Sequence, residues 1–338
     1  VELMLGRWDM DKGLGLSSQR EHEALMNVAM NLASYAMSNE LTSISAEEAK
    51  GIVNQYLEDR NIPIQADSLF STLTQRSGII VEDEGLVYFK HRTFAEYLYA
   101  AKCSKIGSFH PERAFLDPYW SNAFFFFVGI QKDCPSIIAD AFGLCPGSAL
   151  EAWTKIFNAG HVALAGYSTP YSTITDNLHK VFLDAARLYR SITRNEVVTP
   201  LSSLPEVHVL WLFQWIIRDR YAYAFFERSI EPTRCAILEA DASDEDKSYA
   251  LFFLSAVCAE LGKRDAFDGL LAWNKSLPLP IRLGIHCEGL QWAKKNKRTQ
   301  SDLMKRQDKH LRRMLKDNRT LSSEIRQMFD VPMSKRKI

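Results

Sequence analysis

The sequence predicts a mostly α-helical protein with one small β-hairpin near its N-terminus. Apolar residues recur at helical spacing along most of the chain, whereas β-branched and aromatic residues flank a short turn within residues 79–89. Helices followed by such a hairpin are typical of a winged-helix domain. We therefore expect a winged-helix domain, then a superhelical domain built from helical hairpins, and finally a basic helical tail.

Two helices are expected at the start of the winged-helix domain. Residues 21–39 have apolar side chains at the spacing of one amphipathic helix. Ser45 and Glu48 have the spacing of a capping box, in which each side chain satisfies an unpaired backbone amide of the other residue. They predict a second helix that runs to about residue 59.

A third helix and the hairpin should follow. Asp67 is placed to cap this helix, and Gly78, which readily takes the left-handed conformation, should end it. Strands are expected at residues 79–82 and 86–89, joined by a turn at residues 83–85, Asp-Glu-Gly. Acidic residues on the wing repel phosphates, so groove recognition of DNA by this domain is not expected. The residues of the third helix expected to face inward are Leu69, Phe70 and Leu73.

A histidine lies where the second strand meets the next helix. Thr93 and Glu96 have capping-box spacing and predict a helix over residues 94–105, with His91 just before it. An imidazole N–H beside a helix N-terminus adds a donor to the positive end of the helix dipole, which makes a natural anion site. The alternative is a structural histidine that bonds a backbone carbonyl. The aromatic residues expected to fill the core between hairpin and helix are Phe89, Phe94 and Tyr97.

Beyond residue 106 the sequence shows only helical periodicity, interrupted by Pro, Gly and Asn clusters. Ser243, followed by three acidic residues, predicts a capped helix, and further helices are expected after Gly262 and over residues 281–296. Residues 120–127 and 211–226 are rich in Phe, Tyr and Trp. Most of these rings should be core, with one or two left to anchor a partner.

Length and composition indicate a folded protein of two or three domains. The chain has 338 residues, of which 46% are hydrophobic and 24% charged, so the composition of a disordered protein is absent. The six cysteines form no CxxC pair, which argues against disulfides and structural zinc and favours a reducing, cytoplasmic location. The longest apolar stretches are too short to cross a membrane, so no membrane association is expected.

No catalytic motif is present in the sequence. There is no GxxxxGK[ST] phosphate loop, no GxSxG and no HExxH, so no catalytic residues are assigned and the chain alone is not expected to be an enzyme. The eight histidines are scattered, and only His286 and Cys287 are neighbours. Adjacent residues rarely ligate one metal, so no metal site is expected.

The most specific stretch of the sequence is residues 77–101. Its strand-to-helix junction reads Phe-x-His-x-Thr-Phe-x-Glu-Tyr-x-x-Ala, from Phe89 to Ala100. This junction resembles the winged-helix domain of NACHT-type STAND ATPases, the family that includes animal NOD-like receptors and bacterial antiviral defence proteins. Residues 5–9, Leu-Gly-Arg-Trp-Asp, are similar to the end of the family's preceding helical domain. The strong match covers about residues 1–105.

The resemblance implies a nucleotide-driven switch in innate immunity. It implies that the ATP-binding half, with a phosphate loop and Mg²⁺ ligands, precedes this chain, which begins with Val1. ADP or ATP with Mg²⁺ is then the cofactor of the intact protein, and none is bound by this chain alone. In the family the histidine that matches His91 touches the β-phosphate of ADP and helps to hold the resting state closed. A protein or nucleic-acid trigger, whose identity is unknown, would cause homo-oligomerisation.

The C-terminal segment is basic although the whole chain has no net charge. Residues 294–338 hold 15 Lys or Arg against 5 Asp or Glu. One interpretation is a surface for nucleic acid or an acidic partner. The other is a solvated helix whose apolar residues pack on the acidic body of the chain. The candidate polyanion-binding residues are Lys294, Lys295, Lys297, Arg298, Lys305, Arg306, Lys309, Arg312, Arg313 and Lys316.

The expected organisation has four segments. They are the end of a preceding helical domain (residues 1–20), the winged-helix domain (21–105), a helical sensor domain (106–293) and the basic tail (294–338). The predicted function is that of the regulatory and sensing half of a NACHT-type STAND ATPase, which holds the ADP-bound resting state and recognises a trigger in antiviral defence. The alternative is a nucleotide-independent helical interaction scaffold with a nucleic-acid-binding tail.

Overall fold

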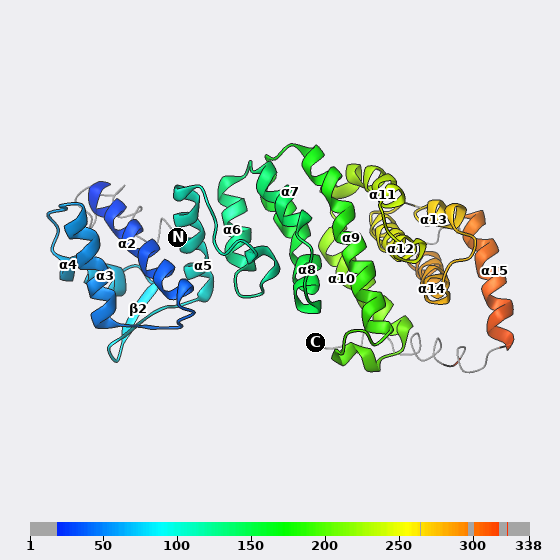
Figure 1. Ribbon diagram of the computed structural model, residues 1–338, viewed down its shortest axis with the longest axis horizontal. Coiled ribbons are helices and arrows are strands. Elements are labelled where there is room, and N and C mark those ends of the chain that lie inside the picture. Colours follow the sequence, from blue (N-terminus) through cyan, green and yellow to red (C-terminus); the bar gives the residue numbers. More distant parts are fainter. Residues whose placement is uncertain (1–18, 264, 297–300, 318–322, 324–338) are drawn as a thin grey trace. The chain divides into compact units, whose positions relative to one another are not determined.

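The computed structural model describes residues 19–263, 265–296, 301–317 and 323, which form two compact units (Figure 1). Unit 1 contains the described residues up to Cys134 together with Ala165–Ser168. Unit 2 contains Pro135–Leu164 and the described residues from Thr169 onward. Most of the segment expected to end a preceding domain lies outside the described residues, and the four expected boundaries stay predictions.

Unit 1 begins with α2 (Gln19–Ser38), α3 (Ala46–Asp59) and α4 (Ala66–Gln75). The capping box of α3 is confirmed. The Glu48 amide donates to the Ser45 hydroxyl at 3.2 Å, and the Ser45 amide donates to the Glu48 carboxylate at 3.3 Å. These bonds satisfy two amides that would otherwise be unpaired at the helix N-terminus, and so they fix where α3 starts.

The predicted ends of α4 are wrong at both positions. Its N-cap residue is Gln65, which makes no side-chain capping bond, so Asp67 lies inside the first turn and does not cap the helix. The helix ends at Gln75 and not at Gly78, whose φ of 65° belongs to the turn into the next strand. Its inward face is as predicted, because its buried residues include Leu69, Phe70 and Leu73.

The predicted hairpin is present and carries an additional strand. β2 (Ile80–Asp83) pairs antiparallel with β3 (Leu86–Phe89). Glu84 and Gly85 both have positive φ, which a two-residue turn requires to follow the twist of the strands. β1 (Ile44–Ser45) pairs with the other edge of β3, which gives the order β1-β3-β2. Helices α2 to α4 followed by this hairpin form the predicted winged-helix arrangement.

The rest of unit 1 contains α5 (Arg92–Ile106), the 3-10 helix η2 (Ala114–Leu116) and α6 (Ser121–Gln131). α5 contacts α2 and α6. Tyr99 of α5 lies at the centre of an aromatic cluster, with its ring centroid 5.5 Å from that of Phe109 and 5.1 Å from that of Trp120. Such tilted and edge-on pairs add to the stabilisation from burial alone.

The regular elements of unit 2 within its described residues are all helices, as the sequence predicts. The N-cap of α12 is Ser243, also as predicted, and its hydroxyl accepts from the Asp246 amide at 3.1 Å. The helix expected after Gly262 begins later, at Asp268. The elements are α7 (Pro135–Gly143), α8 (Ala149–Ala165), α9 (Tyr171–Thr193), η3 (Pro200–Ser203), α10 (Glu206–Tyr221), η4 (Ala224–Ser229), α11 (Ile230–Glu239), α12 (Asp244–Glu260), α13 (Asp268–Trp273), α14 (Leu279–Asn296) and α15 (Asp302–Asp317).

α9 is the central helix of unit 2, because α7, α10, α11 and α12 all pack against it. Tyr189 of α9, Phe213 of α10 and Phe253 of α12 are buried, and their rings form one contiguous cluster. Of the twelve Phe, Tyr and Trp rings in residues 120–127 and 211–226, six are buried, so half of them rather than most are core. Trp215 is 54% exposed and Tyr223 is 42% exposed. Within the described residues, no helix combines the length and apolar character that a membrane crossing requires.

The close approach of α8 and α10 depends on Gly160. A Cβ atom at this position would lie 2.3 Å from the backbone oxygen of Arg220. We expect Gly160→Ala to lower the free energy of unfolding by about 1 to 3 kcal/mol, the usual cost of forcing extra volume into a packed interior. Urea unfolding followed by circular dichroism measures this change.

Gly51 supplies the matched control, because it lies inside α3 and an added Cβ would meet no atom within 4 Å. Gly51→Ala should raise the free energy of unfolding by about 0.5 to 1 kcal/mol, since alanine has the higher helix propensity. If both substitutions changed stability in the same direction, the packing argument for Gly160 would be wrong.

Candidate functional site

His91 lies at the corner between β3 and α5 and is the N-cap residue of α5. Its backbone is extended, its ring is exposed, and the ring centroid lies 5.8 Å from that of Phe94. The ring nitrogens make no hydrogen bond to another described residue, and no side chain caps the helix. The first amides of α5 and the imidazole therefore stand together at an exposed helix N-terminus.

This corner has the chemistry of an anion site. The first turn of a helix presents unpaired N–H groups and a partial positive charge, and an imidazole adds one further donor. α5 has 15 residues, so its dipole is fully developed. The wing residues Glu82, Asp83 and Glu84 are exposed at the tip of the hairpin. Their position agrees with the expectation that the wing does not bind a phosphate backbone.

The capping box predicted at Thr93 and Glu96 does not form. Glu96 is buried, and its carboxylate accepts from Arg92 Nε at 2.9 Å. The Arg92 guanidinium also donates to the backbone oxygen of Tyr119 at 2.9 Å and lies 3.9 Å from the centroid of that ring. A buried carboxylate requires a partner of opposite charge, and the arginine one helical turn earlier supplies it.

The aromatic residues predicted to fill the core between hairpin and α5 are only half-buried. Phe89, Phe94 and Tyr97 all have intermediate exposure. Tyr97 packs edge-on against Phe126 of α6, with ring centroids 5.8 Å apart, and so it faces α6. The core beneath the hairpin is formed by aliphatic residues, among them Ile80 and Val87.

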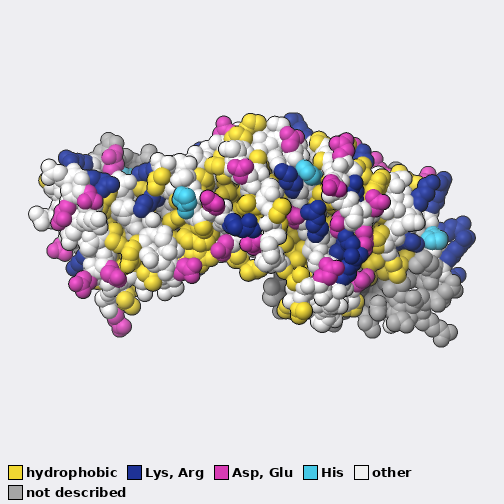
Figure 2. All heavy atoms as spheres, in the orientation of Figure 1, with side chains coloured by type: hydrophobic (Ala, Val, Ile, Leu, Met, Phe, Trp, Pro, Cys, Tyr) yellow, Lys and Arg dark blue, Asp and Glu magenta, His cyan; other side chains and the backbone are white. Residues whose placement is uncertain are grey.

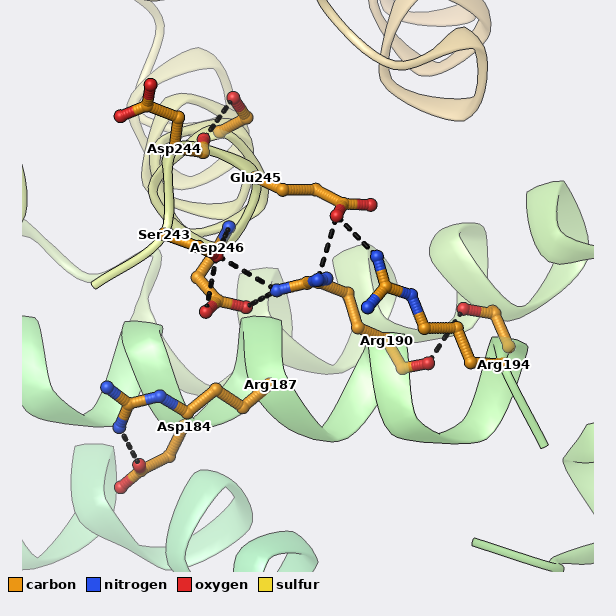
Figure 3. Close-up of polar contacts among 10 residues, drawn as sticks. Asp184, Arg187, Arg190, Arg194, Ser243, Asp244, Glu245 and Asp246 are labelled. Carbon is orange, nitrogen blue, oxygen red and sulfur yellow. Dashed lines mark hydrogen bonds and ion pairs between the residues drawn. The ribbon is translucent and has the colours of Figure 1, made fainter. Parts of the chain in front are cut away.

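A network of arginines and carboxylates joins α9 to the start of α12 (Figure 3). The Arg190 guanidinium pairs with Asp246, pairs with Glu245 at 2.8 Å and donates to the Ser243 hydroxyl at 3.0 Å. Arg194 pairs with the same Glu245 oxygen at 2.5 Å. Sequence reasoning recognised Ser243 only as a cap, because its partner Arg190 lies 53 positions earlier in the chain.

The Arg190 network acts as an electrostatic clamp between two helices. Burial favours a lower pKa for the Arg190 guanidinium, but the bonds to Asp246 and Glu245 more than offset it and raise this pKa above its usual value. Arg190 therefore stays charged at any pH at which the protein is folded. Its side chain is only 15% exposed, so a solvent molecule cannot replace these partners without a local opening.

Sequence reasoning also missed a concavity of about 660 Å³ among α11, α12 and α13. Its buried lining includes Leu251, Leu254 and Leu270, and the ion pair of Glu227 with Lys263 lies at its exposed side. Burial raises the pKa of the Cys258 thiol in this lining to about 11, so the thiol is protonated and unreactive near neutral pH. The lining residues are spread over positions 227–270, and no local motif marks them.

The candidate polyanion-binding residues separate into two groups. Lys294 and Lys295 lie in the last turn of α14, where only the backbone is described, and Lys297 and Arg298 lie outside the described residues. The others are all exposed on α15, where they form a cluster of basic side chains (Figure 2). These are Lys305, Arg306, Lys309, Arg312, Arg313 and Lys316.

The clamp predicts a large difference between two arginines of α9. Arg190→Ala removes hydrogen bonds to charged groups and leaves Asp246 without its cation, so the free energy of unfolding should fall by about 1.5 to 3 kcal/mol. Arg187 is the matched control, because among the described residues its ion-pair partner is Asp184 and its side chain is 51% exposed. Arg187→Ala should cost less than about 1 kcal/mol. Equal losses in urea unfolding would show that the network does not clamp α9 to α12.

Two protein families match the chain. Residues 161–337 match the family described as NACHT C-terminal Helical domain 1, and residues 42–99 match the family described as Novel STAND NTPase 4. The first match covers just over half of the chain, and the second includes the hairpin and His91. No curated protein and no solved structure matches the chain.

The predicted relation to NACHT-type STAND proteins is thereby confirmed. The two matches lie on different segments, one described as a NACHT helical domain and the other as a STAND NTPase. The helical match falls on α8 to α15, within the part of the chain in which the described residues form no strand. The chain therefore belongs to the NACHT and STAND NTPase family, of which it carries a C-terminal helical domain.

Proposed function

We propose that this chain is the regulatory and sensing half of a NACHT-type STAND ATPase and that it holds the ADP-bound resting state through His91. The observation that carries the proposal is the exposed His91 ring, which bonds no described residue, at the N-terminus of α5, where no side chain makes a capping bond. A structural corner histidine would direct a ring nitrogen to a carbonyl of its own chain. The ring nitrogens of His91 instead bond none of the residues that the structure describes, which supports a role in binding a ligand.

The chemistry of the corner fits the β-phosphate of a nucleotide diphosphate. A phosphate oxygen accepts from amides at a helix N-terminus, and the dipole favours its negative charge. The hydrogen bond from His91 then forms only in the state in which the nucleotide lies against α5, so it stabilises that state relative to the open one. Members of the family bind ATP or ADP with Mg²⁺, and in this proposal the ATPase region of the intact protein supplies the phosphate loop and the Mg²⁺ ligands.

Trigger recognition falls to unit 2 in this proposal. Trp215 on α10 and Tyr223 just after it are exposed, whereas half of the aromatic rings in residues 120–127 and 211–226 are core. Large rigid aromatic side chains provide contact area at low entropic cost, and they are frequent anchors at protein interfaces. Binding of a trigger to the open state alone would shift the population away from the ADP-bound state and permit homo-oligomerisation. The antiviral role follows from the resemblance of residues 77–101 to bacterial defence proteins.

The rival function is a nucleotide-independent helical scaffold. It requires neither an ADP contact at His91 nor an ATPase region in the same protein. If the intact protein, purified without added nucleotide, contains no ADP and binds none, the scaffold function is correct and the switch is wrong.

The switch proposal predicts that His91→Ala weakens the retention of ADP and leaves the stability of the fold unchanged. In the intact protein the substitution should accelerate ADP release and raise trigger-free activity by about tenfold to a hundredfold, the value of one hydrogen bond to a charged group. Because the ring is exposed and bonds no described residue, the free energy of unfolding of this chain should change by less than about 0.5 kcal/mol. Release of a fluorescent ADP analogue and thermal unfolding measure the two quantities.

His310 provides the matched control, because its side chain is equally classed as exposed but lies within the α15 helix. His310→Ala should change neither ADP release nor stability. A folded His91→Ala protein that retains ADP as well as the wild type would remove His91 from the switch.

A further inference from the structure

α15 is an amphipathic helix held firmly to unit 2 along one face. Leu311 is fully buried and packs with Leu283 of α14, and Val207 and Leu279 lie against the same cluster. Met304, two turns earlier on α15, is also buried. Met304 and Leu311 therefore pack on unit 2, and the basic side chains of the helix stay exposed.

Polar contacts fix the position of α15 at two further points. The Ser301 hydroxyl donates to Asp268 at 2.5 Å and accepts from the Met304 amide at 3.2 Å, so it both caps α15 and ties it to α13. Asp308, on the side of α15 that faces α14, contacts the His286 ring. The helix is therefore a positioned element, and the side chains on its outer face have a defined geometry.

The outer face of α15 is cationic. Two of its basic residues are partly neutralised within the helix, because Lys305 pairs with Asp302 at 3.2 Å and Arg312 pairs with Asp308 at 2.8 Å. The remaining four pair with no carboxylate of a described residue, and all four are exposed. We call them the cationic ridge: Arg306, Lys309, Arg313 and Lys316.

The spacing of the cationic ridge places its four charges on one side of the helix. Steps of three, four and three residues keep them within roughly 80° of one another around the axis and spread them over about 15 Å along it. Leu311 lies on the opposite side, against α14. Basic side chains cover this part of unit 2 in Figure 2.

We propose that the cationic ridge binds the phosphodiester backbone of double-stranded nucleic acid, without sequence preference. A duplex carries one negative charge per about 1.7 Å of its axis, so a 15 Å ridge meets several phosphates at once. The two arginines present planar forks that match phosphate oxygens. The ridge contains no aromatic residue on which an unpaired base can stack, which favours a duplex over a single strand.

This binding is separate from the proposed nucleotide switch and requires neither ADP nor the ATPase region. It assigns a ligand to unit 2, whereas His91 belongs to unit 1. An acidic protein segment is the competing occupant. Carboxylates on a flexible chain can pair with single cations. They do not form a regular row of charges like the phosphates of a duplex, which the four evenly spaced cations of a rigid helix fit.

The test compares two charge-neutralising variants of the whole 338-residue chain. Lys309→Gln/Arg313→Gln removes two ridge cations, whereas Lys305→Gln/Arg312→Gln removes two cations that already have carboxylate partners. Both lose one lysine and one arginine from α15 and keep every other basic residue of the chain. Binding to fluorescein-labelled DNA and RNA duplexes of the same sequence is followed by anisotropy as salt is raised.

The negative slope of log K against log salt should be shallower by about 2 for the ridge variant, since each lost phosphate contact contributes about 0.9. The control variant should leave the slope within about 0.5 of the wild-type value. The charge-retaining Lys309→Arg/Arg313→Lys variant should bind as the wild type does. His91→Ala should also leave duplex binding unchanged, so failure of the nucleotide switch and failure of the ridge are distinguishable.

Three outcomes would overturn the proposal. Equal losses from the ridge and control variants would show that net charge alone attracts the duplex. Displacement of the duplex by poly-L-glutamate at equal charge concentration would assign the ridge to an acidic protein partner. Absence of duplex binding at low salt, with the circular dichroism of a folded protein, would show that the ridge binds no nucleic acid.

Discussion

Unit 2 buries full charges between its helices, and the positions of these helices depend on keeping every such charge paired. Lys155 is fully buried, with Nζ 2.6 Å from Asp184 and 2.8 Å from the Leu144 carbonyl oxygen. Burial lowers the pKa of Lys155, and Asp184 opposes this change. Removing one partner of such a pair leaves an uncompensated charge in a medium of low dielectric constant, which costs several kcal/mol. The pair therefore fixes α8 against α9.

The same constraint applies at two other helix contacts. Arg190 holds α9 against the start of α12, and Arg218 of α10 pairs with Glu288 of α14, which also accepts from Gln214 at 2.5 Å. Buried pairs of this kind contribute little net stability compared with apolar residues of the same size, but they accept few alternative arrangements. The charges of the cationic ridge, which pair with no described carboxylate, lie at the surface, where water solvates them until a ligand arrives.

The elements that could be predicted from sequence are those whose signal is local. The capping residues Ser45 and Ser243, the hairpin turn and the inward face of α4 all depend on neighbours within four positions. The Glu96 capping box did not form, and the Glu96 carboxylate instead pairs with Arg92, four residues earlier. β1 has two residues, too few to show an alternating pattern. The charged pairs Lys155–Asp184 and Arg218–Glu288 join residues 29 and 70 positions apart, and the lining of the concavity among α11, α12 and α13 is spread over positions 227–270, so no local sequence pattern records them.

The contacts of Arg92 give the corner at His91 a mechanical connection to the rest of unit 1. Arg92 follows His91 directly, and its guanidinium holds the Tyr119 carbonyl just before α6. The Tyr119 hydroxyl in turn donates to the Met37 carbonyl near the end of α2 at 3.3 Å. A small rotation of the first turn of α5 thus pulls on two other helices through rigid planar groups. The corner at His91 is therefore connected to α2 and to the start of α6 by direct side-chain contacts, so a change in the orientation of the first turn of α5 would change the contacts of both helices.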